Sequence, residues 1–167
     1  APAMPQAKKG NNCHISMMGH IAVDAKPGLV HAVIGTAANV SDVSQSRALV
    51  HGEEMDVFND AGYQDVEKHP ENQCSTADWH IAMKRGTRKA LAQDAMGKLM
   101  EQFEKFKASI RAKVEHPFHV LKNLFKHRKT RYRGLAKNEA QLFSLFALVN
   151  LVLARKRLQA LDTRGAP

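Results

Sequence analysis

The chain has 167 residues, of which 44% are hydrophobic and 25% charged, a balance that excludes a disordered protein and suffices for one domain with a buried core. The net charge of +9 is uneven, because residues 1–78 carry −5 and residues 79–167 carry +14. The second part therefore favours a polyanionic partner, nucleic acid before membrane, over an unspecialised basic surface.

The beginning of the chain predicts a hairpin followed by a short helix. Residues 13–24 and 29–40 are expected to be strands, since a Pro-Gly turn signal separates them. Ser41 or Asn39 can cap the helix that follows, and Gly52 should stop it.

Two further strands are expected in the middle of the chain. The apolar stretch 56–58 predicts a third strand, and the alternating stretch 78–83 predicts a fourth. A short helical piece at 64–68 lies between them, and a basic linker at 84–89 follows.

The rest of the chain predicts long helices. Apolar residues recur at three- and four-residue intervals from Met96 to Phe125, and Pro117 should kink or restart this helix. A second helix is expected over 138–158.

Strands first and helices later indicate an α/β or α+β protein with one sheet covered by helices. We expect one domain over 1–160, with its strands within 13–83 and its helices within 91–158. A disordered tail at 161–167 should follow.

Several protein classes are disfavoured. Cys13 and Cys74 are too few for a disulfide framework, which suits a reducing, cytoplasmic setting. Histidines lie near both cysteines, but the sequence contains no C-x2-C motif, which argues against a zinc site. The longest apolar run, 142–154, is shorter than the roughly twenty residues of a membrane span and predicts a buried helix.

One acidic residue stands inside the most basic segment. Residues 105–133 hold ten Lys and Arg but only one acid, Glu115, at the border of the apolar helix face. Arg111, four residues earlier, is the ordinary salt-bridge partner. The functional alternative gives the carboxylate to a metal ion and leaves Arg111 and Lys122 for DNA phosphates. The residues alone leave both open.

A second carboxylate, Asp60, follows the third predicted strand. Ligand groups project from strand ends in open sheets, and a carboxylate there can hold Mg²⁺. The ordinary alternative is a turn Asp that bonds its own backbone, as Asp-x-Gly sequences commonly do.

Six ordered segments carry a family resemblance: Lys8–Asn11, His20–Asp24, Gly35–Asn39, Asp60–Gln64, Arg111–Phe118 and Arg131–Asn138. Together they resemble the catalytic domain of bacterial insertion-sequence transposases of the DDE type, in the group named after insertion sequence five. The likeness extends from residue 2 to residue 157.

The resemblance implies an RNase H-like fold, a mixed sheet with flanking helices, and three metal-binding carboxylates. Asp60 corresponds to the second and Glu115 to the last. Two Mg²⁺ or Mn²⁺ ions, DNA as transposon end and target, and a homodimer are implied for the intact enzyme. The implied location is the bacterial cytoplasm, at the nucleoid, with no membrane contact.

Cationic residues around Glu115 are the candidate DNA contacts. Arg111 and Lys122 match the family's spacing of Tyr, Arg, Glu and Lys, but the Tyr position holds Ala108. Asn59, before the second Asp, is bulkier than the family's usual residue. The complete set of expected DNA contacts is Arg111, Lys122, Lys126, Arg128, Lys129, Arg131 and Arg133.

The first catalytic Asp of the family has no counterpart in this sequence. It belongs to an opening strand upstream of Lys8, and Asp24 matches a hairpin Asp of the family instead. We therefore expect an N-terminally truncated, inactive transposase that lacks the first strand and the region recognising transposon ends. The alternatives are a non-catalytic DNA-binding fragment and a non-functional remnant that barely folds.

Overall fold

The computed structural model describes residues 6–9, 12–15, 17–68, 70–72 and 76–165. The chain forms two compact units. Unit 1 comprises Ala1–Val40 and Val114–Pro167, and unit 2 comprises Ser41–Lys113.

The predicted hairpin is confirmed in unit 1. Strands β3 (Met17–Val23) and β4 (Val30–Ala37) pair antiparallel. The Asp24 amide donates to the Leu29 carbonyl at 3.0 Å, and the Gly28 amide donates to the Asp24 carbonyl at 2.8 Å. Gly28 has φ +75°, which glycine adopts without strain, so the Pro-Gly signal correctly located the turn.

The beginning of unit 1 forms a separate two-stranded pair. Strands β1 (Gln6–Lys9) and β2 (Asn12–Ile15) pair antiparallel. The predicted first strand, 13–24, is therefore divided between β2 and β3. Cys74, residues 10–11 and residues 166–167 lie outside the described residues.

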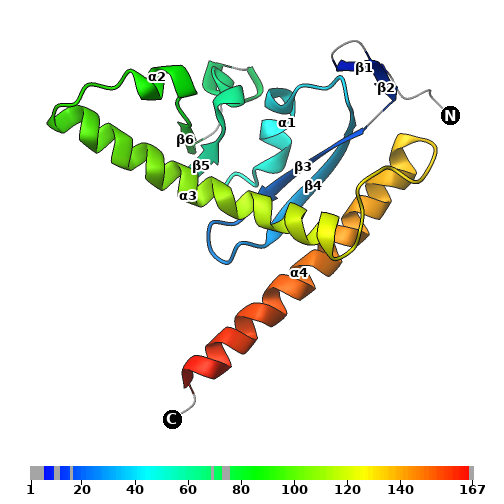
Figure 1. Cartoon of the computed structure of the whole chain (residues 1–167). Helices are drawn as coiled ribbons and strands as arrows, with labels where there is room; N and C mark the ends of the chain where they lie inside the picture. Colours follow the sequence, from blue (N-terminus) through cyan, green and yellow to red (C-terminus); the bar gives the residue numbers. More distant parts are fainter. Residues whose placement is uncertain (1–5, 10–11, 16, 69, 73–75, 166–167) are drawn as a thin grey trace. The chain divides into compact units, whose positions relative to one another are not determined.

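The main core of unit 1 lies between the hairpin and two helical segments. Helix α4 spans Leu135–Gly165, and α3 spans Ala95–Asn123, with its end in unit 1 (Figure 1). Phe118 packs edge-on against Phe146 at 5.6 Å. The buried core side chains are Val30, Val33, Val120, Leu121, Leu142, Phe146, Val149 and Leu153. The apolar run 142–154 therefore forms the predicted helix, but only one of its faces is buried.

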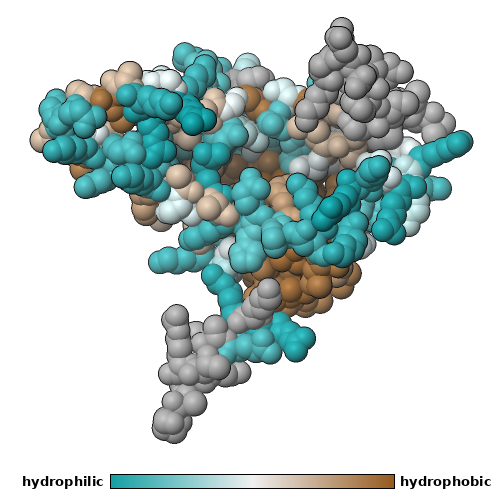
Figure 2. Space-filling view, in the orientation of Figure 1, coloured by the Kyte–Doolittle hydropathy of each residue, from teal (hydrophilic) through white to brown (hydrophobic). Residues whose placement is uncertain are grey.

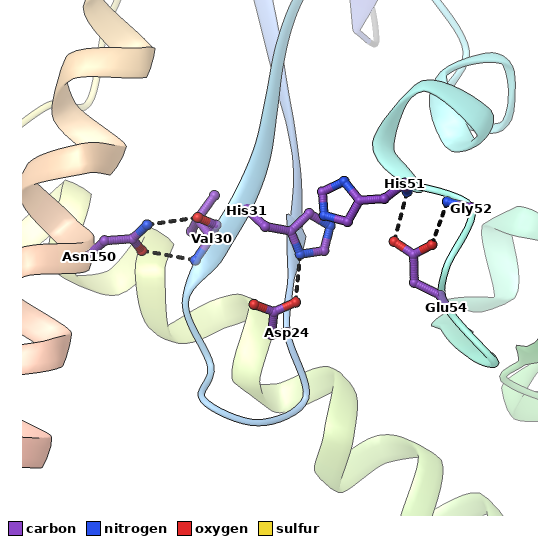
Figure 3. A network of polar contacts seen from close by, with 7 residues as sticks. All are labelled: Asp24, Val30, His31, His51, Gly52, Glu54 and Asn150. Atoms are coloured by element: carbon purple, nitrogen blue, oxygen red, sulfur yellow. Dashed lines mark hydrogen bonds and ion pairs between the residues drawn. The ribbon is translucent and has the colours of Figure 1, made fainter.

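Polar side chains of α4 also bond the backbone of β4. The Asn150 amide accepts from Val30 N–H at 2.9 Å and donates to the Val30 carbonyl at 2.7 Å (Figure 3). Near the other end of β4, the Gly35 amide donates to Glu139 at 3.1 Å. The spacings agree: eleven helical residues rise ~16 Å, as do five strand residues. Helix and strand thus run alongside each other in opposite directions.

Unit 2 contains shorter elements. Helix α1 (Asp42–Leu49) follows Ser41 at its N-cap and precedes Gly52, whose φ is +95°. Strands β5 (Asp56–Asn59) and β6 (Asp78–Ile81) pair in parallel. Between and after them lie the one-turn helices η1 (Ala61–Tyr63), η2 (Val66–Lys68), η3 (Pro70–Asn72) and the short helix α2 (Arg85–Lys89).

The first part of α3 packs on the β5–β6 pair through aromatic rings. His80 stacks on Phe58 at 4.7 Å between ring centroids and meets Phe103 edge-on at 6.0 Å. Phe106 also meets Phe58, at 6.2 Å. These contacts cover one face of two four-residue strands that could not form a stable pair alone.

Buried ionic groups add a second attachment. Glu104 and Lys107 form an ion pair with side-chain exposures of 3% and 7%. Glu104 accepts from the Met83 amide at 3.0 Å, and Lys107 donates to the Ile81 carbonyl at 2.8 Å. The pair therefore secures the end of β6 to α3.

Several predictions differ from the structure. The described strands form three separate pairs, not one sheet. No further strand pairs with β4 among the described residues, because Asn150 and Glu139 of α4 bond backbone groups of β4 that such a strand would need. Helix α2 replaces most of the predicted linker, and α4 continues to Gly165, into the predicted tail. Helix α3 does not restart at Pro117, whose side chain is buried just before the core residues Val120 and Leu121.

Apolar side chains remain exposed on both long helices. On α4 they include Phe143, Leu148 and Leu151, and Figure 2 shows a brown patch over the middle of this helix. None of the helices in the described ranges is long and apolar enough to span a membrane.

Candidate metal site and nucleic-acid interface

Asp60 stands at the end of β5, as expected, and caps η1. Its Oδ1 accepts a hydrogen bond from the Gly62 amide at 2.7 Å. A Cβ on Gly62 would lie 2.9 Å from this oxygen, so glycine keeps the turn open. Asp60 therefore acts as a turn residue, as the ordinary alternative predicts, and uses one carboxylate oxygen to do so. The second oxygen, Oδ2, is not part of that turn.

Arg111 approaches the second oxygen of Asp60. Its Nη2 lies 3.8 Å from Asp60 Oδ2, with side-chain exposures of 34% and 52%. The sequence predicts Arg111 to be a partner of Glu115 or of DNA. The structure gives it Asp60 as a charged neighbour within unit 2. At this distance and exposure the contact contributes only about 0–1 kcal/mol, so it leaves both groups able to bind others.

Glu115 is exposed on α3, in unit 1. It lines an open groove together with Phe118, His119, Lys122, Asn123 and Arg128. Lys122 Nζ lies over the Phe118 ring, 5.6 Å from its centroid. Within the described part of the chain, no hydrogen bond or ion pair engages the Glu115 carboxylate. Its oxygens can therefore accept a cation without breaking an existing contact.

The remaining predicted DNA contacts follow Glu115 in the α3–α4 loop. Arg128 is tied to the end of α3, with Nε 3.3 Å from the Lys122 carbonyl and Nη2 3.2 Å from Asn123 Oδ1. The other side chains are exposed: Lys126, Lys129, Arg131 and Arg133. Burial, with a smaller effect of Arg131, lowers the pKa of His127, so that side chain is neutral at pH 7.

The predicted site residues thus fall into two groups. Asp60 and Arg111 belong to unit 2, whereas Glu115, Lys122 and the loop belong to unit 1. Each group joins a carboxylate to cations, which suits binding of a phosphate through an ion or directly.

A family model described as "Transposase DDE domain" matches residues 3–151. The chain belongs to this transposase family. The match includes Asp60, Glu115 and the whole cationic loop. Membership indicates a role in DNA transposition, DNA as partner and dependence on a divalent metal ion. No solved structure matches the chain.

The carboxylates of this DDE transposase domain fit a hard divalent cation chemically. Mg²⁺ and Mn²⁺ prefer carboxylate oxygens, which both Asp60 and Glu115 offer. Among the described residues, Asp60 Oδ2 forms one ion pair, with Arg111 at 3.8 Å, and Glu115 is exposed. Neither carboxylate would have to leave a buried ion pair in order to bind.

Asn138, near the beginning of α4, supports the α3–α4 loop and was not singled out from the sequence. Its side chain is 2% exposed. The amide donates to the carbonyls of Tyr132 and Gly134, each at 2.7 Å, and accepts from Tyr132 N–H at 3.1 Å. It thereby fixes the loop between Arg131 and Arg133. The only available signal was its place at the end of the Arg131–Asn138 motif.

Tyr63, next to the Asp60 turn, was also not predicted. Burial, followed by the charges of Asp42 and Asp60, raises its pKa to about 12. The phenol therefore stays protonated at neutral pH and does not act as a base.

Proposed function

We propose that the chain carries two of the three carboxylates of an RNase H-like DNA transposase of the insertion sequence five group. Asp60 and Glu115 are the proposed metal ligands, with Mg²⁺ or Mn²⁺ as the ion. The observation that carries the proposal is a family match containing both carboxylates, each exposed and adjacent to cations.

The protein groups have separate proposed roles. Arg111 balances the charge of Asp60, and its remaining N–H groups are available to a DNA phosphate. Lys122 and the exposed loop cations neutralise phosphates on transposon-end or target DNA at the bacterial nucleoid. Bound ions would activate an attacking oxygen and stabilise the leaving oxygen at a phosphodiester.

On this proposed correspondence, the family's first Asp has no counterpart within these 167 residues. Because phosphoryl transfer depends on positioning and electrostatics, we propose that this polypeptide by itself is inactive. Supercoiled plasmid incubated with the chain and Mn²⁺ should stay intact. Robust nicking that Asp60→Asn abolishes would contradict the proposed inactivity and support the role of Asp60.

A longer polypeptide tests the carboxylate roles directly. If coding sequence upstream supplies an Asp on a short apolar run, the extended chain should nick plasmid. Asp60→Asn and Glu115→Gln should each lower the rate about 100-fold or more. Asp24→Asn is the matched control, because Asp24 bonds His31 Nδ1 at 2.8 Å in the hairpin (Figure 3). Equal losses in all three variants would refute the assignment.

A non-catalytic DNA-binding fragment is the second candidate, favoured by the exposed cations of the α3–α4 loop. It predicts duplex binding that weakens steeply with salt, without any metal requirement. Binding that is absent at about 50 mM salt would exclude it. A cooperative thermal unfolding transition would argue against a non-functional remnant, and sedimentation velocity tests the proposed homodimer.

A further inference from the structure

Unit 2 has a cationic groove of ≈630 Å³ between α2, the α2–α3 connection and the beginning of α3. It is lined by Arg85, Arg88, Lys89, Leu91, Ala92, Gln93, Gly97, Lys98, Glu101, Gln102 and Lys105. Five of these residues are cationic and one is acidic. None belongs to the predicted DNA contacts.

The acidic residue fixes part of the groove and leaves most of its positive charge available. Glu101 accepts from Arg88 Nε at 2.9 Å and Nη2 at 2.8 Å, a bidentate pair. Lys105 lies 3.8 Å from the same carboxylate. Arg85, Lys89 and Lys98 are exposed. These three cations can therefore meet an anionic partner without losing an internal partner seen in the described structure.

The floor of the groove depends on glycine. Gly97 is buried in the first turn of α3, and its amide donates to Asp94 at 2.7 Å. A Cβ at this position would lie 1.9 Å from the Ala92 carbonyl oxygen. The backbone of the α2–α3 connection thus lies directly on the helix, which brings the cations of α2 opposite those of α3.

The packing of the apolar side of α3 favours a hydrophilic polyanion over a membrane surface. Exposed apolar residues on this helix are Met96, Leu99, Met100, Phe103 and Phe106. At about 100° per residue, the centre of this stripe lies roughly 160° from the groove-lining positions 97, 98, 101, 102 and 105. A membrane-binding helix inserts its apolar face into the lipid. Here Phe103 and Phe106 instead contact His80 and Phe58 on the β5–β6 pair, and Figure 2 shows hydrophilic side chains over α2.

The lining also distinguishes duplex from single-stranded nucleic acid. Proteins that bind single strands stack bases on aromatic side chains. The groove's apolar lining consists of Leu91, Ala92 and Gly97, without an aromatic ring among its residues. Lys98 and Lys105 are seven residues apart on one helix face, ~10 Å along the axis. Such a row suits contacts to successive backbone phosphates.

We propose that this groove binds the phosphate backbone of duplex DNA and is a second DNA-binding surface of the chain. All residues that line this groove belong to unit 2, whereas the α3–α4 loop belongs to unit 1. The proposal rests on the proposed function only in taking DNA as the partner, and it requires neither Asp60 nor a metal ion.

The test compares two triple variants of the full chain on a 30-base-pair duplex, by fluorescence anisotropy from 50 to 300 mM salt without divalent metal. The groove variant is Arg85→Ala, Lys89→Ala and Lys98→Ala. The charge-matched control is Lys26→Ala, Arg155→Ala and Arg157→Ala, at exposed positions outside both surfaces. The groove variant should bind at least about tenfold more weakly at 100 mM salt. The magnitude of its salt slope should fall by about 2.7, for three lost phosphate contacts.

A charge-conserving variant separates contact from folding. Arg85→Lys, Lys89→Arg and Lys98→Arg should retain the wild-type salt slope, and circular dichroism should show equal helix content in every variant. Equal weakening of groove and control variants would overturn the proposal. So would an unchanged DNA affinity accompanied by lost binding to single-stranded DNA or phosphatidylserine vesicles. The proposed catalytic function is tested separately. Asp60→Asn should abolish nicking by the extended chain but leave DNA binding by the groove unchanged.

Discussion

The two units hold their candidate functional residues in opposite ways. Unit 2 fixes Asp60 at a strand end, bonds one of its oxygens to Gly62 and places Arg111 beside the other. Unit 1 leaves Glu115 exposed and carries its cations on a loop whose backbone bonds the Asn138 side chain. Substitution of Asp60 should therefore disturb a local turn as well as function, whereas substitution of the exposed cations of unit 1 should disturb binding alone.

The largest expected effect comes from removing the loop cations. Lys126→Ala, Lys129→Ala, Arg131→Ala and Arg133→Ala together should lower the magnitude of the salt slope for duplex binding by about 3.6. Because all four side chains are exposed, the thermal midpoint should hardly change. Salt-dependent anisotropy and thermal circular dichroism measure the two quantities. A large drop in midpoint would contradict the contrast between the units.

The buried ion pair provides the converse case in unit 2. Lys107→Met leaves the Glu104 carboxylate buried without its cation and should cost about 3–5 kcal/mol of unfolding free energy. Adding Glu104→Gln removes the charge but keeps an acceptor for the Met83 amide, so the double variant should recover much of that loss. Urea titration of both variants measures the difference. If the double variant is the less stable one, the ion pair does not secure β6 as described.

Asn138 tests whether the loop needs its internal support. Asn138→Ala removes three hydrogen bonds to the loop backbone and should cost about 1–3 kcal/mol. DNA affinity should fall severalfold, because Arg131 and Arg133 lose a fixed backbone. Asn138→Asp keeps the acceptor for Tyr132 N–H but not the two donors, and should be intermediate in both properties. Identical affinity for wild type and Asn138→Ala would show that loop order is irrelevant to binding.

Local patterns predicted the elements better than their assembly. The Pro-Gly turn, the helix start after Ser41 and the periodicity of Met96–Phe125 each act over a few residues, and the structure confirms them. The helix that Gly52 was expected to stop already ends at Leu49. Asn150 was only an interruption in an apolar run, because its partner Val30 lies 120 residues away. The contacts of Glu104 and Lys107 with the end of β6 were likewise not predicted, because they join residues far apart in the sequence.

The candidate site shows the same limit. Strand-end position and the Asp-x-Gly sequence correctly predicted both the location of Asp60 and its turn hydrogen bond. Helical spacing suggested Arg111 for Glu115, but the fold of unit 2 brings Arg111 towards Asp60. Spacing within one helix could not reveal a neighbour supplied by another element. The metal and DNA roles of these residues stay predictions.

The smallest effect concerns Tyr63, and it probes the electrostatics beside Asp60 without altering the DNA surfaces. Its pKa of about 12 in the folded chain exceeds the ordinary value of 10. Burial is the largest cause, and the negative charges of Asp42 and Asp60 raise the pKa further. The folded state therefore holds the phenolic proton more tightly than the unfolded state. Stability should consequently fall as pH rises from about 10 to about 12. Spectrophotometric titration should show a delayed phenolate signal that disappears in Tyr63→Phe, whereas Tyr132→Phe should leave it in place. Asp60→Asn should move the delayed titration only slightly lower, since Asp60 is the last of the three causes.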